Sequence, residues 1–188
     1  MTTVAVAVTT SVFDFLALQA QIVAASRKAF ADMKRLSPRD PVCSFALYSD
    51  DGAMTVCPAF DTAGKLAARL AANQGDLSYK FSPAEWAYES KGAVREFDRI
   101  CASVGDHAMS LEKGFATFRK QLFETCLNAL DELRDAGQFA TTPPMLVMFD
   151  VSDSDISKAT QIARMKRLNG GAPHVAELAA WTKTWGVR

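Results

Sequence analysis

Apolar residues recur at or close to helical spacing along two long stretches of the chain. Residues 12–36 carry the first series, which a Ser-Pro pair ends: Phe13, Leu16, Ala20, Val23, Phe30 and Met33. Residues 110–136 carry the second, which a glycine follows: Leu111, Phe115, Phe118, Leu122, Cys126, Leu130 and Leu133. This spacing gathers apolar side chains on one face of a helix. We therefore predict two long amphipathic helices, the second with Ser110 as its N-cap.

Shorter stretches show a weaker helical pattern. They carry apolar residues on one side and end at turn-forming residues. Four such helices are predicted, over residues 61–73, 92–104, 156–168 and 175–185. A loop around Gly105 and Asp106 is expected to close the second of them, and residues 77–81 are expected to form a short edge strand.

The remaining apolar segments predict a sheet. The segments VCSFALYS and AMTVCPAF flank an Asp-Asp-Gly tripeptide as the strands of a hairpin would. A tight turn on Asp51 and Gly52 sets Phe45 opposite Pro58. The apolar run 145–151, which follows two prolines, predicts a central strand of the same sheet.

Together these segments predict an α+β fold. Its small, mainly antiparallel sheet consists of hairpin 42–60 and strand 145–151, with several α-helices flanking it. The chain has 188 residues and shows no internal repeat or linker, so we expect a single domain over residues 1–188.

Charge and cysteine content narrow the functional classes. With 21 basic and 21 acidic residues the net charge is zero, so no overall positive field attracts nucleic acid. The start MTTVAVAVTT lacks the basic segment of a secretion signal, and no apolar stretch is long enough to span a bilayer, so we expect a cytoplasmic protein. The cysteines are too far apart for a CxxC motif, and the hairpin register places Cys43 and Cys57 on opposite faces. Reduced thiols and no cofactor are therefore expected.

The segment SPAEWAYE combines carboxylates and aromatic rings in a way that suggests chemistry. Ser82, Pro83 and Glu85 match the order N-cap, N1 and N3 of a capping box, which gives Glu85 a structural role. Glu85 and Glu89 lie one helical turn apart, but a paired acid and base is normally held on separately supported elements around a cleft. We interpret the segment as a short capped helix, anchored by a buried Trp86.

A second acidic segment, FDVSDSD, follows the predicted strand 145–151. Its three aspartates, Asp150, Asp153 and Asp155, have the oxygen ligands that Mg²⁺ or Ca²⁺ prefers, although the spacing differs from an EF-hand loop. The competing interpretation is a helix start, with Asp153 or Ser154 as the N-cap. We favour the helix start and expect no metal.

Other catalytic motifs do not occur. The sequence has no GxSxG elbow, no phosphate-binding glycine loop, no dinucleotide fingerprint and no HExxH motif. The basic residues Arg164, Lys166 and Arg167 are expected to form a solvated helix face.

The segments FALYSDDG, SPAEWAYE and VMFDVSDSD, followed by Asn169, resemble in order and spacing a bacterial family, domain of unknown function 4303. The similarity covers about residues 42–169. This family has no assigned activity. In gene context and size, its members are similar to small proteins that neutralise toxins of bacterial competition, including contact-dependent and type VI delivered toxins.

The resemblance implies a cytoplasmic immunity protein that binds a cognate toxin, without being an enzyme. A cytoplasmic toxin of this kind would attack nucleic acid or a nucleotide. An acidic rim of Asp50, Asp51, Asp153 and Asp155 would face its basic cleft and speed association. The alternatives are a metal-dependent hydrolase that uses the aspartates at 150–155, and a non-catalytic interaction module.

Overall fold

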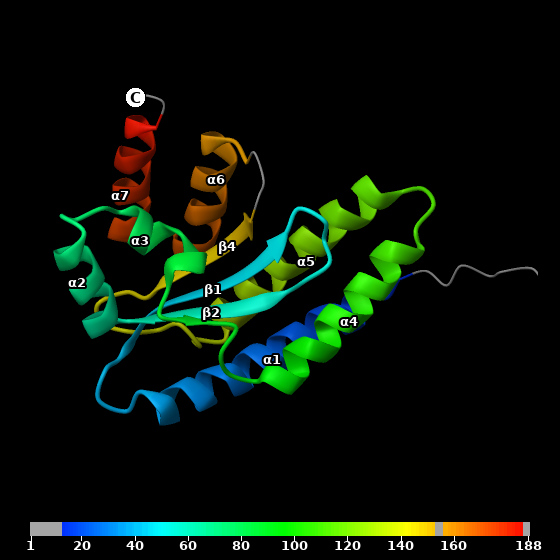
Figure 1. Cartoon of the computed structure of the whole chain (residues 1–188), viewed down its shortest axis with the longest axis horizontal. Helices are drawn as coiled ribbons and strands as arrows, with labels where there is room; N and C mark the ends of the chain where they lie inside the picture. The colour runs from blue at the N-terminus through cyan, green and yellow to red at the C-terminus, as the bar shows by residue number, and fades with distance from the viewer. Residues whose placement is uncertain (1–12, 153–155, 186–188) are drawn as a thin grey trace, which may run out of the picture.

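The computed structural model describes residues 13–152 and 156–185. At its centre lies a four-stranded sheet in the order β3-β2-β1-β4 (Figure 1). β1 pairs antiparallel with β2 and parallel with β4, and β3 pairs antiparallel with β2. The strands are β1 (Val42–Asp50), β2 (Cys57–Thr62), β3 (Tyr88–Glu89) and β4 (Leu146–Ser152). The fold is the predicted α+β class.

The hairpin of β1 and β2 has a longer connection than predicted. Phe45 lies opposite Phe60 instead of Pro58, so the predicted register is wrong by two residues. The cause is the side chain of Asp50, which accepts hydrogen bonds from the Met54 amide at 3.2 Å and the Thr55 hydroxyl at 2.5 Å and so holds a wide loop. A slip of two residues leaves every side chain on its predicted face.

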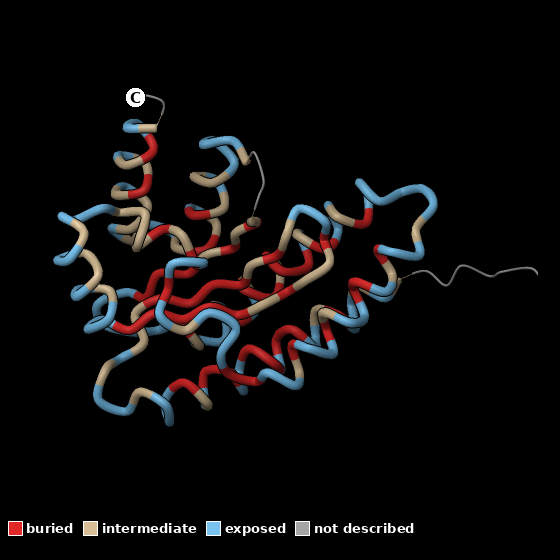
Figure 2. Tube along the Cα trace, in the orientation of Figure 1, coloured by how far each residue is buried: buried red, intermediate tan, exposed pale blue. Residues whose placement is uncertain are grey.

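Three long helices cover one face of the sheet. They are α1 (Phe15–Leu36), α4 (Val94–Ser110) and α5 (Phe115–Asp135). Their buried stripes face Phe45, Leu47 and Phe60 of the sheet, as the colouring of Figure 2 shows along each helix. Phe30 of α1 contacts both phenylalanines, with ring centroids 4.8 and 5.1 Å apart. This layer holds the larger core.

The opposite face of the sheet has a smaller core. It is covered by α3 (Ser78–Phe81), α6 (Lys158–Asn169) and α7 (Pro173–Trp181), while α2 (Ala63–Ala72) lies at the end of the sheet and buries none of its residues (Figure 1). The 3-10 turns η1 (Pro83–Glu85) and η2 (Thr182–Thr184) complete this side. Across the described ranges, no helix has the length and apolar character needed to cross a bilayer.

The boundary between α4 and α5 differs from prediction. α4 continues through Gly105, because the missing side chain there lets the helix approach the Met54 carbonyl; an added Cβ would lie 3.3 Å from that oxygen. Ser110 is consequently the last residue of α4, not the N-cap of the next helix. α5 begins after Gly114, whose φ of 84° suits glycine.

Two further elements correct the sequence-based prediction. Residues 77–81 form a helical turn instead of an edge strand, because the Asp76 carboxylate accepts the Ser78 amide at 2.9 Å and starts the turn. β4 lies at the edge of the sheet instead of its centre. Its apolar sequence is explained by the helices that cover both of its faces.

Candidate functional site

The segment SPAEWAYE does not form a capping box. Residues 83–85 make only a 3-10 turn, and the Ser82 side chain caps nothing. Glu85 is exposed, and Trp86 already has extended backbone angles, which end the turn. The paired carboxylates of Glu85 and Glu89 therefore do not share a helix face, because Glu89 belongs to β3.

Trp86 has the structural role that the sequence indicates. Its side chain is 4% exposed and packs in the smaller core with Ala46, Ala59 and Leu146 of the sheet. The indole Nε1 donates a hydrogen bond to the Lys80 carbonyl at 3.1 Å. Burial against the sheet is thus confirmed for this residue.

Of the four aspartates in the predicted acidic rim, the structure describes Asp50 and Asp51. Asp50 uses its carboxylate to hold the loop after β1, and Asp51 forms an ion pair with Arg119 at 2.8 Å. Asp153 and Asp155 lie outside the described residues. Asp50 and Asp51 are therefore engaged within the chain.

The start of α6 also differs from prediction. Ser157 is its N-cap, and the Ser157 hydroxyl accepts the Thr160 amide at 3.2 Å, so neither Asp153 nor Ser154 has this role. Among the described residues, no group of three or more His, Cys, Asp or Glu side chains is placed to hold a metal ion. Of the three aspartates in the hydrolase alternative, Asp150 is the one whose position is described.

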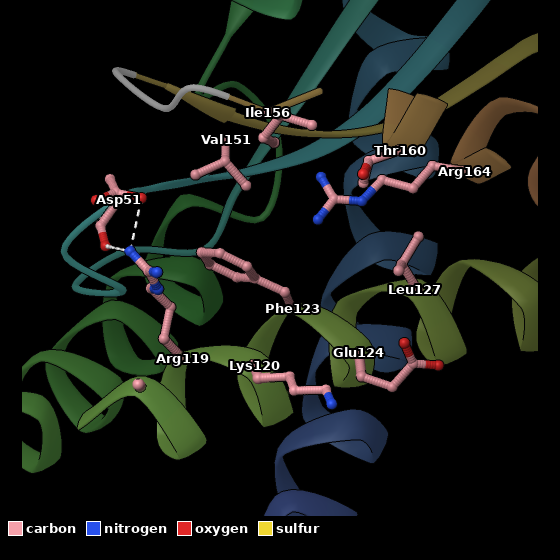
Figure 3. A pocket seen from close by; sticks show the side chains of 11 residues that line it. Asp51, Arg119, Lys120, Phe123, Glu124, Leu127, Val151, Ile156, Thr160 and Arg164 are labelled. Carbon is pink, nitrogen blue, oxygen red and sulfur yellow. Dashed lines mark hydrogen bonds and ion pairs between the residues drawn. The ribbon is translucent and has the colours of Figure 1, made fainter. Parts of the chain in front are cut away.

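A concavity opens at the end of β4. It has a volume of about 790 Å³ and lies between α5, the loop after β1, and the start of α6 (Figure 3). Its walls include the apolar side chains of Phe123, Leu127, Val151 and Ile156. Such a site, at the carboxyl ends of two parallel strands, is where ligands commonly bind in sheet proteins.

Arg164 gives this cavity its distinctive chemistry. Figure 3 shows its guanidinium reaching from α6 into the cavity. The group lies over the Phe149 ring, 5.0 Å from the centroid, and its Nη1 atom is buried without a hydrogen-bond partner in the described structure. Burial lowers the pKa of Arg164, while Asp150 and Glu124 oppose this shift. An incompletely paired, half-buried guanidinium is costly unless a ligand supplies an acceptor.

Two other basic side chains line the same cavity from α5. Arg119 is held by Asp51, and its Nη1 atom lies 2.8 Å from the Asp51 carboxylate (Figure 3). Lys120 makes no ion pair with any residue in the described parts of the chain. Lys120 and Arg164 therefore place positive charge around an apolar floor without an ion pair to any residue in the described parts of the chain.

Arg164 also borders a second, smaller cavity of about 90 Å³ on the other side of β4. Ser82, Asp150 and Trp181 contribute to its lining, so the segments SPAEWAYE and FDVSDSD meet there. Burial raises the pKa of Asp150, and the Val151 amide and Arg164 oppose the shift. Arg164 thus borders both cavities, and the partly buried Asp150 lines the smaller one with it.

The basic residues of α6 are not a uniformly solvated face. Lys166 is exposed, as expected. Arg167 instead bonds across to α5, with its Nε donating to Asp131 and its Nη1 to Glu124, each at 2.7 Å. Arg164 points into the cavity because α6 packs against β4, which turns the side chain inward.

Asn169 closes the outer edge of β4. Its Oδ1 accepts the Val147 amide at 2.9 Å, and its Nδ2 donates to the Val147 carbonyl at 2.7 Å. One side chain thereby replaces a missing strand neighbour. This residue of the family pattern has a structural role.

Replacing Asn169 tests that role. We expect Asn169→Ala to lower the free energy of unfolding by about 1–3 kcal/mol, because both polar groups of Val147 lose their partner. Urea denaturation measures the change. The control Asn73→Ala removes a single hydrogen bond at the end of α2 and should cost about 0.5–1.5 kcal/mol. Equal small losses in both variants would contradict the proposed closure of the edge.

Sequence reasoning missed the cavity, although α5 carries a signal. Its polar face places Ala116, Arg119, Lys120 and Phe123 at helical spacing, and a phenylalanine on such a face indicates a contact surface. The contribution of Arg164 has no comparable signal, because it depends on the packing of α6 against β4.

Comparisons with known proteins identify the family. No curated protein and no solved structure matches the chain. A family model matches residues 22–170. This range includes strands β1, β2 and β4, the strand residues that line the two cavities, and Asn169. The chain therefore belongs to the family described as Domain of unknown function (DUF4303).

Proposed function

We propose that this chain is a cytoplasmic immunity-type protein, which binds and neutralises a cognate bacterial toxin through the cavity at the end of β4. The family to which the chain belongs has no assigned activity. The proposal rests on the resemblance in gene context and size between members of this family and toxin-neutralising proteins. The toxin would be delivered by a contact-dependent or type VI system and would act on nucleic acid or a nucleotide. Binding alone is sufficient for neutralisation, so no catalytic group is required.

The observation that carries the proposal is the combination of free positive charge with an apolar floor. Arg164 and Lys120 lack acidic partners at hydrogen-bond distance within the described chain. The apolar side chains of Phe123, on α5, and Ile156, just before α6, line the same cavity. Protein interfaces commonly place aromatic and arginine side chains in such a central region.

Charge complementarity indicates which kind of toxin segment would occupy the cavity. A segment of the toxin that carries a carboxylate beside an apolar side chain would pair with Arg164 and fill the space above Phe123. A carboxylate would give the Arg164 guanidinium the acceptor that it lacks. The proposed acidic rim is accordingly limited to Asp153 and Asp155, which would make a second contact with a basic cleft of the same toxin.

Co-expression with the protein encoded by the neighbouring gene tests this function. If that protein is toxic when expressed alone, the chain should restore growth, and the two purified proteins should form a complex in size-exclusion chromatography. Failure to restore growth together with the absence of a complex would overturn the proposal.

Two substitutions locate the interface. We expect Arg164→Met to weaken toxin binding by about 30-fold or more, since loss of a central charged contact typically costs about 2 kcal/mol. Lys120→Glu should weaken binding and slow association, with the larger effect at low salt. The matched control Lys65→Glu changes an exposed lysine on α2, far from the cavity, and should bind normally. Normal binding by folded Arg164→Met and Lys120→Glu would place the interface elsewhere.

A further inference from the structure

Two cysteines from distant parts of the chain lie side by side. Cys57 is the first residue of β2, and Cys101 lies in the middle of α4. Their Sγ atoms are 3.9 Å apart, and both residues are half-buried free thiols. A small oxidant can therefore reach a pair of sulfur atoms that are already in contact.

The environments of the two sulfur atoms differ. The Sγ of Cys101 accepts the Val56 amide at 3.4 Å, and its thiol donates to the Val56 carbonyl at 3.3 Å. It also lies 3.9 Å from the Cys57 sulfur, and either thiol can be the donor of that contact. The Cys57 thiol lowers the pKa of Cys101 to about 7, and the Val56 amide adds to this effect, while burial, Asp98 and Asp50 oppose it. The hydrogen bond with Cys101 raises the pKa of Cys57, and burial and the charge of Cys101 add to that shift, while hydrogen bonds from Ser90 and Tyr48 oppose it.

Two hydroxyl groups, those of Ser90 and Tyr48, lie beside the Cys57 sulfur and favour its ionised form. Tyr48 lies opposite Cys57 in the hairpin, and its hydroxyl is hydrogen-bonded to Glu89 at 2.8 Å and Ser90 at 2.9 Å. Burial raises the pKa of Tyr48, so this group stays protonated and adds no charge beside the thiols. Cys101 is thus the thiol of the pair that ionises more readily, and Cys57 is its neighbour.

We propose that Cys57 and Cys101 form an oxidisable dithiol site, which a hydroperoxide converts to an intramolecular disulfide. In the first step the Cys101 thiolate attacks the O–O bond of hydrogen peroxide, giving a sulfenic acid and hydroxide. The Cys57 sulfur then attacks the sulfenic sulfur, the S–S bond forms, and the sulfenic oxygen leaves as water. Overall, two thiols and one hydrogen peroxide give one disulfide and two waters.

The reaction requires only a short movement. The sulfur atoms must approach from 3.9 Å to about 2.05 Å to form the bond. The bond would join β2 to α4 across a sequence separation of 44 residues. A cross-link of this span restricts the unfolded chain, so the oxidised protein should melt at a higher temperature than the reduced protein.

The other cysteines provide internal controls. Cys43 is half-buried like the proposed pair, but burial raises its pKa and its Sγ lies near the Ser44 hydroxyl instead of a second sulfur. Cys126 is fully buried, and burial raises its pKa as well. Neither should react when Cys57 and Cys101 do.

Treatment of the reduced full chain with one equivalent of hydrogen peroxide tests the site. Peptide mapping should find a cross-link between Cys57 and Cys101, with a mass lower by about 2 Da for two lost hydrogens. Two of four thiols should remain titratable in denaturant. Cys43→Ser should form the same cross-link.

The single variants separate the two roles. Cys57→Ser should stop at the sulfenic acid of Cys101, which a dimedone adduct reports, whereas Cys101→Ser should leave Cys57 unmodified. Thermal melts of both variants check that they are folded. First oxidation at Cys43, a dimedone adduct on Cys57, or disulfides only between molecules would overturn the proposal.

Discussion

Replacing Arg69 by leucine is expected to lower the free energy of unfolding by about 3–5 kcal/mol, the usual cost of leaving a buried charge without its partner. Arg69 of α2 forms an ion pair with Asp61 of β2, whose side chain is fully buried. Asp61 also accepts the Thr62 amide at 2.9 Å. Without Arg69, the carboxylate keeps its hydrogen bonds from the Thr62 and Ala87 amides but loses the charge that compensates its burial. Urea denaturation at neutral pH measures the loss.

The pH dependence of this loss has a definite sign. Burial raises the pKa of Asp61, while Arg69 opposes the shift, so removing Arg69 raises this pKa further. A carboxyl group with a raised native pKa favours the folded state at low pH, and this contribution falls as pH rises through the native pKa. The deficit of Arg69→Leu should therefore be largest at pH 7 to 8 and smaller near pH 4. A deficit that is independent of pH would contradict the role assigned to Asp61.

Arg35→Leu is the matched control for the buried pair. Arg35 forms an ion pair with Asp32 on the surface of α1, but its side chain is 72% exposed. Exposed ion pairs contribute about 0–1 kcal/mol. Similar losses in the Arg35 and Arg69 variants would show that burial of Asp61 does not determine the effect.

Replacing Trp86 by alanine is the second substitution with a large expected effect. We expect the free energy of unfolding to fall by about 3–5 kcal/mol, because the indole fills the smaller core and a cavity would remain. Its hydrogen bond to the Lys80 carbonyl would also be lost. Trp86→Phe should recover most of the packing and lose only the contribution of that bond, about 1 kcal/mol. Chemical denaturation of both variants provides the comparison.

The neighbouring polar residues serve as controls for Trp86. Ser82→Ala and Glu85→Ala should each cost less than about 0.5 kcal/mol, because neither side chain caps a helix. Toxin binding should be retained in both. If these two variants fold normally but lose binding, the segment SPAEWAYE would be an interaction site instead of a structural anchor.

The sheet and the long helices could be predicted because their apolar periodicity reports burial directly. Strand β4 was located from its apolar run, and only its position at the edge was missed, since helices on both faces give the same pattern as a central strand. The length of the hairpin loop was missed for a different reason. It depends on the side chain of Asp50, which hydrogen-bonds to residues four and five positions later.

The individual side-chain interactions were harder to predict than the fold, because the residues that make them come from separate elements. Asp61 was assigned to a helix start by its sequence, whereas the structure places it in β2 and gives it a partner on α2. Arg164 was assigned to a solvated face, whereas packing of α6 directs it into the cavity. Cys57 and Cys101 lie far apart in sequence, so no spacing rule indicates their contact. Tertiary packing determines each of these positions.

Closure of β4 by Asn169 restricts how a partner can be recognised. A peptide that added itself as a further strand would need the Val147 amide and carbonyl, which Asn169 already occupies. The same contact protects the edge from uncontrolled association between copies of the chain. A partner of the proposed kind would therefore have to be recognised on this side by side-chain shape and charge. Its specificity could then change through substitutions in the cavity while the backbone of the sheet stays the same.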